Sequence, residues 1–248
     1  MPVSDGGISL LRDVTRGDVP MRRCGRSYRE PVATTSRGAR SRQAIVTGAA
    51  ELFAERGFAN VSVSDVAERV GLTKGAFYFH FATKEQLAQA VCASYHEWLV
   101  DLQRRVAEQE PDPLRRIPRV LLDAALAYRS DPSARGTTRL LEESNQLQLP
   151  FLSPLWTRWW AATLAEAQTV GLVAGDVDVD RLAWTLTAAY YGTQSNSYAE
   201  SSWSGLPARL ADLLRFALLP VVSRPDAARI LADDLDRLAG QANSSRWR

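Results

Sequence analysis

The fold is decided by residues 62–86, which read SVSDVAERVGLTKGAFYFHFATKEQ. Ser62 with Asp65 three positions later is typical of a helix N-terminus, because each side chain can satisfy a backbone N–H of the other. An apolar face follows over the next two turns, and Gly71 supplies the left-handed conformation that ends a helix. Only two residues separate Gly71 from a second helical stretch over 74–80. This spacing predicts a helix-turn-helix.

Helical patterns extend on both sides of the motif. Apolar positions over 45–53 form one stripe that is closed by Gly57, and Thr83 begins a long helix that Pro111 and Pro113 stop. Strand signals are nearly absent. We therefore expect an all-α protein, with an N-terminal three-helix helix-turn-helix domain and a larger helical domain. The later helices are expected over 117–130, 133–147, 154–170, 178–197, 206–219 and 226–239.

Composition and motifs exclude several classes of protein. The 248 residues are 46% hydrophobic, and no apolar run approaches the roughly 20 residues of a membrane-spanning helix. Neither a signal peptide nor a cysteine framework is present, so we expect a cytoplasmic protein with no metal site. No phosphate-binding loop, nucleophile elbow or histidine pair occurs, which argues against an enzyme.

Charge is distributed unevenly along the chain. Residues 1–42 hold nine arginines and four acidic residues, a net charge of +5, whereas the rest of the chain carries −3. A basic leader is typical of an arm that binds a polyanion, although a solvated tail would have the same composition. The expected organisation is a disordered basic leader at 1–38, a DNA-binding domain at 39–85, a ligand-binding and dimerisation domain at 86–222, and a C-terminal helix and tail at 223–248.

The second helix of the motif has the chemistry of a DNA-contacting element. It is too short and too weakly apolar for a good core helix, and its leading residues Thr73, Lys74 and Gly75 are small or cationic. Gly75 would let the backbone approach a base edge, and Lys74 can reach guanine or a phosphate. Tyr78 and His80 can donate hydrogen bonds to phosphates.

Lys84, in the first turn of the next helix, adds a charge beside backbone N–H groups that favour an anion. Plainer interpretations stay open, since helix-turn-helix patterns are common in all-α proteins and a histidine such as His80 is often structural. Phe77, Phe79 and Phe81 are expected to lie partly in the core.

Residues 72–91, LTKGAFYFHFATKEQLAQAV, resemble the DNA-binding domain of TetR-family transcriptional repressors. The stretches SDPSARGTTRL at 130–140, LPFLSPLW at 149–156 and DVDVDRLAWTL at 176–186 are similar to the γ-butyrolactone-receptor branch of that family. The resemblance covers residues 40–222 and is less specific in its C-terminal part. Phe77 stands where the family commonly has leucine, which should alter packing inside the domain rather than the operator sequence.

The resemblance implies a homodimer that places one recognition helix of each subunit in the major groove of an inverted-repeat operator. Base contacts then fall to Thr73, Lys74 and Gly75, and phosphate contacts to Tyr78, His80 and Lys84. Arg37, Arg40 and Arg42 would extend the footprint.

The implied function is a ligand-responsive repressor without a cofactor. It would be released from double-stranded DNA by a small γ-butyrolactone-type molecule and would control secondary metabolism such as antibiotic biosynthesis through quorum sensing. The alternative is a pseudo-receptor of the same fold that answers to an antibiotic, to another ligand or to none.

Tryptophan clusters mark the candidate ligand pocket. Trp156, Trp159 and Trp160 cannot all face one way, because successive helical residues are turned by about 100°. Trp159 fits a core position, whereas Trp156 falls where the resemblance places a pocket tryptophan. Thr137, Arg139 and Gln194 are the expected polar neighbours of the ligand. Dimerisation is expected to use helices 178–197 and 206–219 through Leu182, Leu186, Leu210, Leu213 and Leu214.

Overall fold

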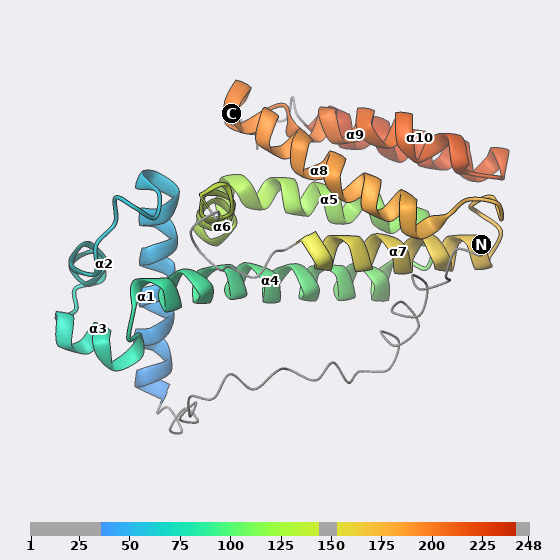
Figure 1. Ribbon diagram of the computed structural model, residues 1–248. Coiled ribbons are helices and arrows are strands. Elements are labelled where there is room, and N and C mark those ends of the chain that lie inside the picture. The colour runs from blue at the N-terminus through green and yellow to red at the C-terminus, as the bar shows by residue number, and fades with distance from the viewer. Residues whose placement is uncertain (1–35, 144–152, 242–248) are drawn as a thin grey trace, which may run out of the picture.

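The computed structural model describes residues 36–143 and 153–241, and within them the protein is helical. The only extended pairing in these ranges is an isolated bridge between Val173 and Val222, so the all-α prediction is confirmed. Figure 1 shows α1, α2 and α3 gathered at one end of the molecule, with α4 running from them along the remaining helices. The elements are α1 (Ser36–Arg56), α2 (Val63–Arg69), α3 (Lys74–His80), α4 (Lys84–Gln109), α5 (Pro113–Ser130), α6 (Pro132–Glu142), α7 (Ser153–Thr169), α8 (Val179–Ser201), α9 (Leu206–Ala217), η3 (Leu219–Val221) and α10 (Pro225–Gly240).

Local capping explains most of these boundaries. The Ser62 side chain accepts from the Asp65 N–H, and the Asp65 carboxylate accepts from the Ser62 N–H at 2.7 Å. Gly57 and Gly71 have φ of +75° and +66°, the left-handed conformation that ends α1 and α2. The predicted helix at 117–130 begins earlier, at Pro113, because Asp112 caps it and a proline is well suited to the first helical position.

Two hydrophobic cores divide the chain, and α4 belongs to both. Its first turns, with Leu87 and Val91, pack into the N-terminal core, whereas Tyr95 and the apolar positions that follow pack into the larger C-terminal core. The domain boundary expected at residue 85 therefore falls inside α4, a helix that contributes to both cores. The C-terminal helix expected within 223–248 is α10, and its Leu231 and Leu235 are buried in the larger core.

The predicted outer segments differ in smaller ways. Helix α1 begins at Ser36, inside the leader expected at 1–38, and residues 1–35 lie outside the described ranges. Helix α6 ends at Glu142 with Glu143 as its C-cap, and residues 144–147 of the helix expected to reach 147 also lie outside them.

Helix α6 is held tightly against α1, and the end-on view of α6 in Figure 1 shows it between α1 and α5. Gly136 allows this approach, since a Cβ atom there would lie 2.6 Å from the Ala50 carbonyl oxygen. Glu143, which follows α6, accepts a 2.7 Å hydrogen bond from the Phe58 N–H just beyond α1. Leu140 is buried in the N-terminal core. Through these contacts α6 packs on α1 and supports the helix-turn-helix domain.

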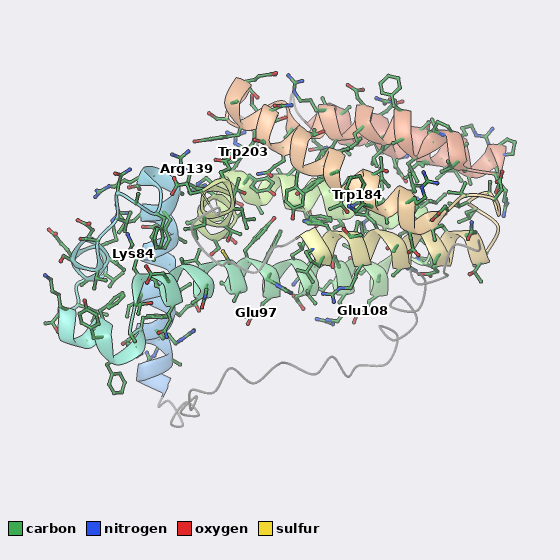
Figure 2. The ribbon with its side chains drawn as sticks, in the orientation of Figure 1. Lys84, Glu97, Glu108, Arg139, Trp184 and Trp203 are labelled. Carbon is green, nitrogen blue, oxygen red and sulfur yellow. The ribbon has the colours of Figure 1, made fainter. Side chains whose placement is uncertain are left out.

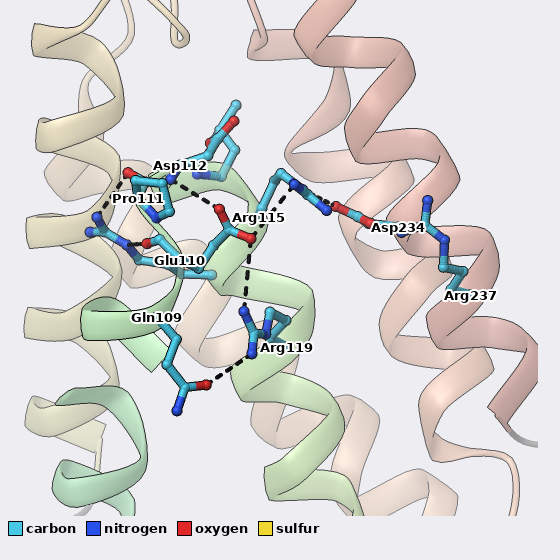
Figure 3. A network of polar contacts seen from close by, with 10 residues as sticks. Gln109, Glu110, Pro111, Asp112, Arg115, Arg119, Asp234 and Arg237 are labelled. Carbon is cyan, nitrogen blue, oxygen red and sulfur yellow. Dashed lines mark hydrogen bonds and ion pairs between the residues drawn. The ribbon is translucent and has the colours of Figure 1, made fainter. Parts of the chain in front are cut away.

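A polar network fixes the opposite end of α4 (Figure 3). Arg116 donates a 2.7 Å hydrogen bond to the Glu110 carbonyl, and Arg115 donates at 2.9 Å to Asp234 of α10. Arg115 and Arg119 also approach the Glu110 carboxylate at 3.6 and 3.8 Å. The network joins the α4–α5 corner to α10, so the C-terminal end of α4 is anchored while its first turns lie in the DNA-binding domain.

The leucines expected to form the dimer surface belong instead to the core of the subunit. Leu186, Leu210 and Leu214 are fully buried, and Leu182 and Leu213 pack partly against the same core. The stripe predicted from the sequence is therefore the inward face of α8 and α9. Within the described residues, no helix is both long and apolar enough to span a membrane.

Candidate nucleic-acid interface and effector cavity

Buried side chains and a backbone hydrogen bond hold the helix-turn-helix so that one face of α3 points to solvent. Phe77 of α3 is completely buried and packs near Phe81, with ring centres 6.0 Å apart. The turn between α2 and α3 is held by a 2.8 Å hydrogen bond from the Leu72 N–H to the Ala67 carbonyl. The inward position predicted for Phe77 is confirmed, and it fixes the direction in which α3 presents its other side chains.

The N-terminal tip of α3 is exposed and sterically open. Thr73 caps the helix by accepting from the Ala76 N–H at 3.2 Å, while Lys74 and Gly75 lie at the surface. A Cβ atom added at Gly75 would meet nothing nearer than the Thr73 hydroxyl, at 3.9 Å. The fold itself therefore does not require a glycine here, which is consistent with a constraint imposed by a binding partner.

Tyr78, Phe79 and His80 complete the outward face of α3. Tyr78 is 55% exposed, and Phe79 is 81% exposed, with its ring edge-on to His80 at a centroid distance of 5.2 Å. The expected partial burial of Phe79 is wrong, because the helix turns this side chain away from Phe77. An apolar ring this exposed on α3 is a functional candidate that the alternation of aromatic residues alone could not identify.

Lys84 lies in the first turn of α4, as expected, and its ammonium is held by the loop between α1 and α2 (Figure 2). Its ammonium donates to the Phe58 and Val61 carbonyls at 2.8 and 2.9 Å, and lies 4.1 Å from the centre of the Phe58 ring. Two of its three donors are thus used inside the domain, where they join the start of α4 to the α1–α2 loop. The phosphate contact expected of Lys84 stays a prediction, for which the third N–H of the ammonium is left.

The basic residues at the start of α1 differ in their surroundings. The Arg42 guanidinium lies 5.0 Å from the centre of the Phe81 ring, so this residue packs at the base of the motif. Arg40 is exposed and lines a groove between α1 and α2. Arg37 lies in the first turn of α1, with its side chain outside the described set. The DNA contacts expected of all three stay predictions.

A cavity of about 190 Å³ lies between α4, α5, α6, α7 and α8. Trp156, predicted as a pocket residue, lines it and is 1% exposed. Gln194 also lines it and donates a 3.1 Å hydrogen bond to Thr138. Among the described residues, the lining comprises Tyr95, Tyr128, Thr138, Leu141, Glu142, Trp156, Tyr191, Gln194 and Ser195.

Two of the predicted ligand contacts fall outside this lining. Thr137 is fully buried on another face of α6, beside Cys92 of the N-terminal core, and its neighbour Thr138 faces the cavity instead. Arg139 lines a smaller adjacent cavity of about 40 Å³ and pairs with Glu143 at 3.0 Å. The packing of α6 against α1 decides which of its side chains face the cavity, and the ligand contacts expected of Thr137 and Arg139 stay predictions.

Tyrosine hydroxyls cluster behind the cavity wall. The Tyr128 and Tyr190 hydroxyls are 3.1 Å apart, and the buried Tyr95 and Tyr191 hydroxyls have no hydrogen-bond partner among the described residues. Burial raises the pKa of all four phenols above the ordinary tyrosine value, so they remain protonated and can donate. Nothing in the sequence pattern indicated this cluster, since its members come from three different helices.

An outward, partly cationic helix tip and a largely apolar cavity in one chain define a class of protein, the helix-turn-helix transcriptional regulators. The comparisons with known proteins agree. Residues 45–91 match the family described as bacterial regulatory proteins, tetR family. The A-factor receptor protein of Streptomyces griseus is 31% identical over 220 residues, covering 88% of this chain and 76% of the relative. The chain belongs to the TetR family of transcriptional regulators, and its relatives are regulators rather than enzymes.

Solved structures place it near one branch of that family. A crystal structure of a γ-butyrolactone receptor (ArpA-like protein) matches with a TM-score of 0.69 at 27% identity, covering 83% of this chain and 99% of the other. CprB of Streptomyces coelicolor, solved with its operator sequence, matches with a TM-score of 0.67 at 29% identity, covering 82% and 98%. The predicted relationship to γ-butyrolactone receptors is confirmed.

Proposed function

We propose that this protein is a repressor that binds an inverted-repeat operator as a homodimer and is released by a small γ-butyrolactone-type molecule. The names of its relatives support the ligand class, since they include an A-factor receptor and γ-butyrolactone receptors. The relative solved with an operator supports DNA as the partner. Control of secondary metabolism is the corresponding biological role.

The observation that carries the proposal is the double role of α6. Thr138, Leu141 and Glu142 of this helix line the cavity, while Gly136 lies against the backbone of Ala50 in α1. A ligand that displaces the cavity face of α6 must also disturb its α1 face, since a packed interface of this kind cannot absorb the shift. Helix α6 therefore links ligand binding in the cavity to the position of α1, which supports α3.

The energetic requirement is that the ligand bind better to the form that does not fit the operator. A ligand with equal affinity for both forms would change nothing. Two recognition helices must meet successive major grooves about 34–36 Å apart, or a multiple of it, so a modest reorientation of each subunit is enough to lose the fit.

The outer sides of α8 and α9 are the proposed dimer surface. Trp184 is 67% exposed on α8, and Phe216 is 83% exposed on α9. One turn and two turns beyond Trp184, Ala188 and Gly192 are exposed, and Gly192 has open space where a Cβ would stand. Large apolar side chains beside small ones would let the same helices of a second subunit pack closely.

The proposal is tested by release of DNA. An operator is first selected from a random pool of duplexes with the purified protein, and the complex is then titrated with γ-butyrolactones, butenolides and antibiotics in a mobility-shift assay. Release by a lactone is expected. Release by an antibiotic alone, or by none of the compounds, would contradict the lactone receptor and support the pseudo-receptor alternative.

A further inference from the structure

Lysine is nearly absent from this chain. Among its 30 lysine and arginine residues, only Lys74 and Lys84 are lysines, and they begin α3 and α4 of the DNA-binding domain. The two kinds of cation differ chemically, because a lysine amine can lose its proton and react as a nucleophile, whereas the arginine guanidinium stays protonated. A reagent that attacks side-chain amines therefore has two positions to choose between, and both lie next to the DNA-contacting helix.

The fold hinders a reaction at Lys84. Its ammonium donates to the Phe58 and Val61 carbonyls at 2.8 and 2.9 Å, and the centre of the Phe58 ring lies 4.1 Å away. An acylated amine keeps a single N–H, so acylation of Lys84 would cost one of these hydrogen bonds. The acyl group would also need room between the ring and the loop that joins α1 to α2. We therefore expect Lys84 to be the slower of the two amines.

Lys74 is open to reagents. Its side chain is exposed at the start of α3, and it makes no hydrogen bond or ion pair with the residues that the structure describes. The next residue, Gly75, has no side chain that could cover the amine. Lys74 is thus the accessible lysine of the chain, and it lies at the tip of the helix that faces DNA.

We propose that Lys74 is an acylation site, at which an activated acyl donor, an acyl phosphate or an acyl thioester, prevents operator binding. The unprotonated amine attacks the carbonyl carbon of the donor and an N–C bond forms. The C–O or C–S bond of the donor breaks, phosphate or thiolate leaves, and the nitrogen gives its remaining extra proton to solvent. The product is a neutral amide, and the step is neither an oxidation nor a reduction.

Acylation removes what Lys74 offers to DNA. An ammonium that can reach guanine or a phosphate becomes an uncharged amide with one N–H. A bound duplex would cover the same nitrogen, so the acyl donor and the operator compete for Lys74. Modification therefore acts on the free repressor and keeps it off DNA. The inference goes beyond the proposed function, since it involves neither the cavity nor its ligand and requires only that α3 bind DNA.

The first experiment maps the reaction. Full-length protein is treated in parallel with acetyl phosphate and acetyl-coenzyme A, and peptide mass spectrometry gives the rate of acetylation at each lysine. Lys74 is expected to react at least about tenfold faster than Lys84, which has hydrogen bonds to lose. Saturating operator duplex should slow the reaction of Lys74, and the faster donor identifies the acyl source. Similar rates at the two lysines, no protection by the duplex, or no reaction of Lys74 with either donor would overturn the inference.

The second experiment measures operator affinity before and after acetylation by fluorescence anisotropy. Affinity of the original protein should fall at least about tenfold, the size of effect expected for one lost contact to a base. Lys74→Arg lacks this amine but keeps every other amine of the chain, so the same treatment should leave its own starting affinity unchanged. Lys84→Arg is the matched control and should lose as large a factor as the original protein. An equal loss in treated Lys74→Arg would contradict the assignment.

Reductive dimethylation separates the loss of charge from the added bulk. It places two methyl groups on the nitrogen but keeps the positive charge, so it should cost less operator affinity than acetylation. Equal losses would contradict neutralisation as the cause. If lactones release the operator while acetylated protein binds it normally, the inference fails and the proposed function stands. If the protein selects no operator from the random pool, both fail.

Discussion

At the scale of single residues, two glycines separate the demands of the fold from the demands of the partner. Gly136 is required by the protein itself, because a Cβ atom would press into the Ala50 backbone. The fold does not require Gly75, since a Cβ atom there would lie 3.9 Å from its nearest neighbour, the Thr73 hydroxyl. The same substitution at the two positions should therefore have opposite effects.

Gly75→Ala is expected to preserve or raise thermal stability, by up to about 1 kcal/mol, because alanine favours a helix over glycine. Operator affinity should fall at least about tenfold, since the added methyl stands between the α3 backbone and the DNA. Calorimetric melting and fluorescence anisotropy measure the two effects separately. Normal operator affinity in this variant would mean that the backbone of Gly75 does not approach the DNA.

Residue-scale prediction from sequence succeeded where a local signal exists. The helix starts at Ser62 and Thr83 and the inward position of Phe77 follow from short-range patterns, and the structure has all three. Lys84 could not be placed in this way, because its partners Phe58 and Val61 lie in a loop more than twenty residues earlier. A cationic residue in the first turn of a helix resembles an anion site until its tertiary neighbours are known.

At the scale of elements, α6 and α4 connect the cavity to the domain that contains α3. Helix α4 is anchored at Glu110 by the network of Figure 3 and begins inside the DNA-binding domain. Helix α6 packs on α1 and lines the cavity. Both elements were expected from their periodicity, but their double membership was not, because a sequence pattern marks an apolar face without saying which core it enters.

Gly136→Ala tests the α1–α6 contact. We expect the free energy of unfolding to fall by about 1–3 kcal/mol, because the neighbouring atoms are backbone and the helices must separate. Operator affinity or its response to lactone should change with it. Gly75→Ala serves as the matched helical control in chemical denaturation, and equal stability of the two variants would show that the α1–α6 interface can yield freely.

At the scale of the whole molecule, the proposed homodimer would place two α3 tips at a fixed separation. The apolar periodicity of α8 and α9 indicated leucines for the interface, yet those leucines fill the core of the subunit. Hydrophobic periodicity identifies the most apolar face of a helix, and in α8 and α9 that face packs into the core of the subunit. The outward Trp184 and Phe216 are isolated in the sequence and have no pattern to mark them.

Trp184→Glu is expected to weaken the dimer by at least about 2 kcal/mol, since two-fold symmetry introduces the charge twice. Sedimentation equilibrium at several concentrations measures the change. Val100→Glu on α4 places the same charge at another exposed apolar position, and should leave association unchanged. A Trp184→Glu dimer as tight as the original would require another interface.

The most direct test of the account is the operator affinity of Lys74→Ala, measured by anisotropy on the selected duplex, with sedimentation confirming that the variant stays dimeric. We expect specific binding to be lost while the dimer and its melting temperature are unchanged, because Lys74 is exposed at the tip of α3. Full affinity in a dimeric Lys74→Ala protein would contradict the assignment of this tip as the element that reads DNA.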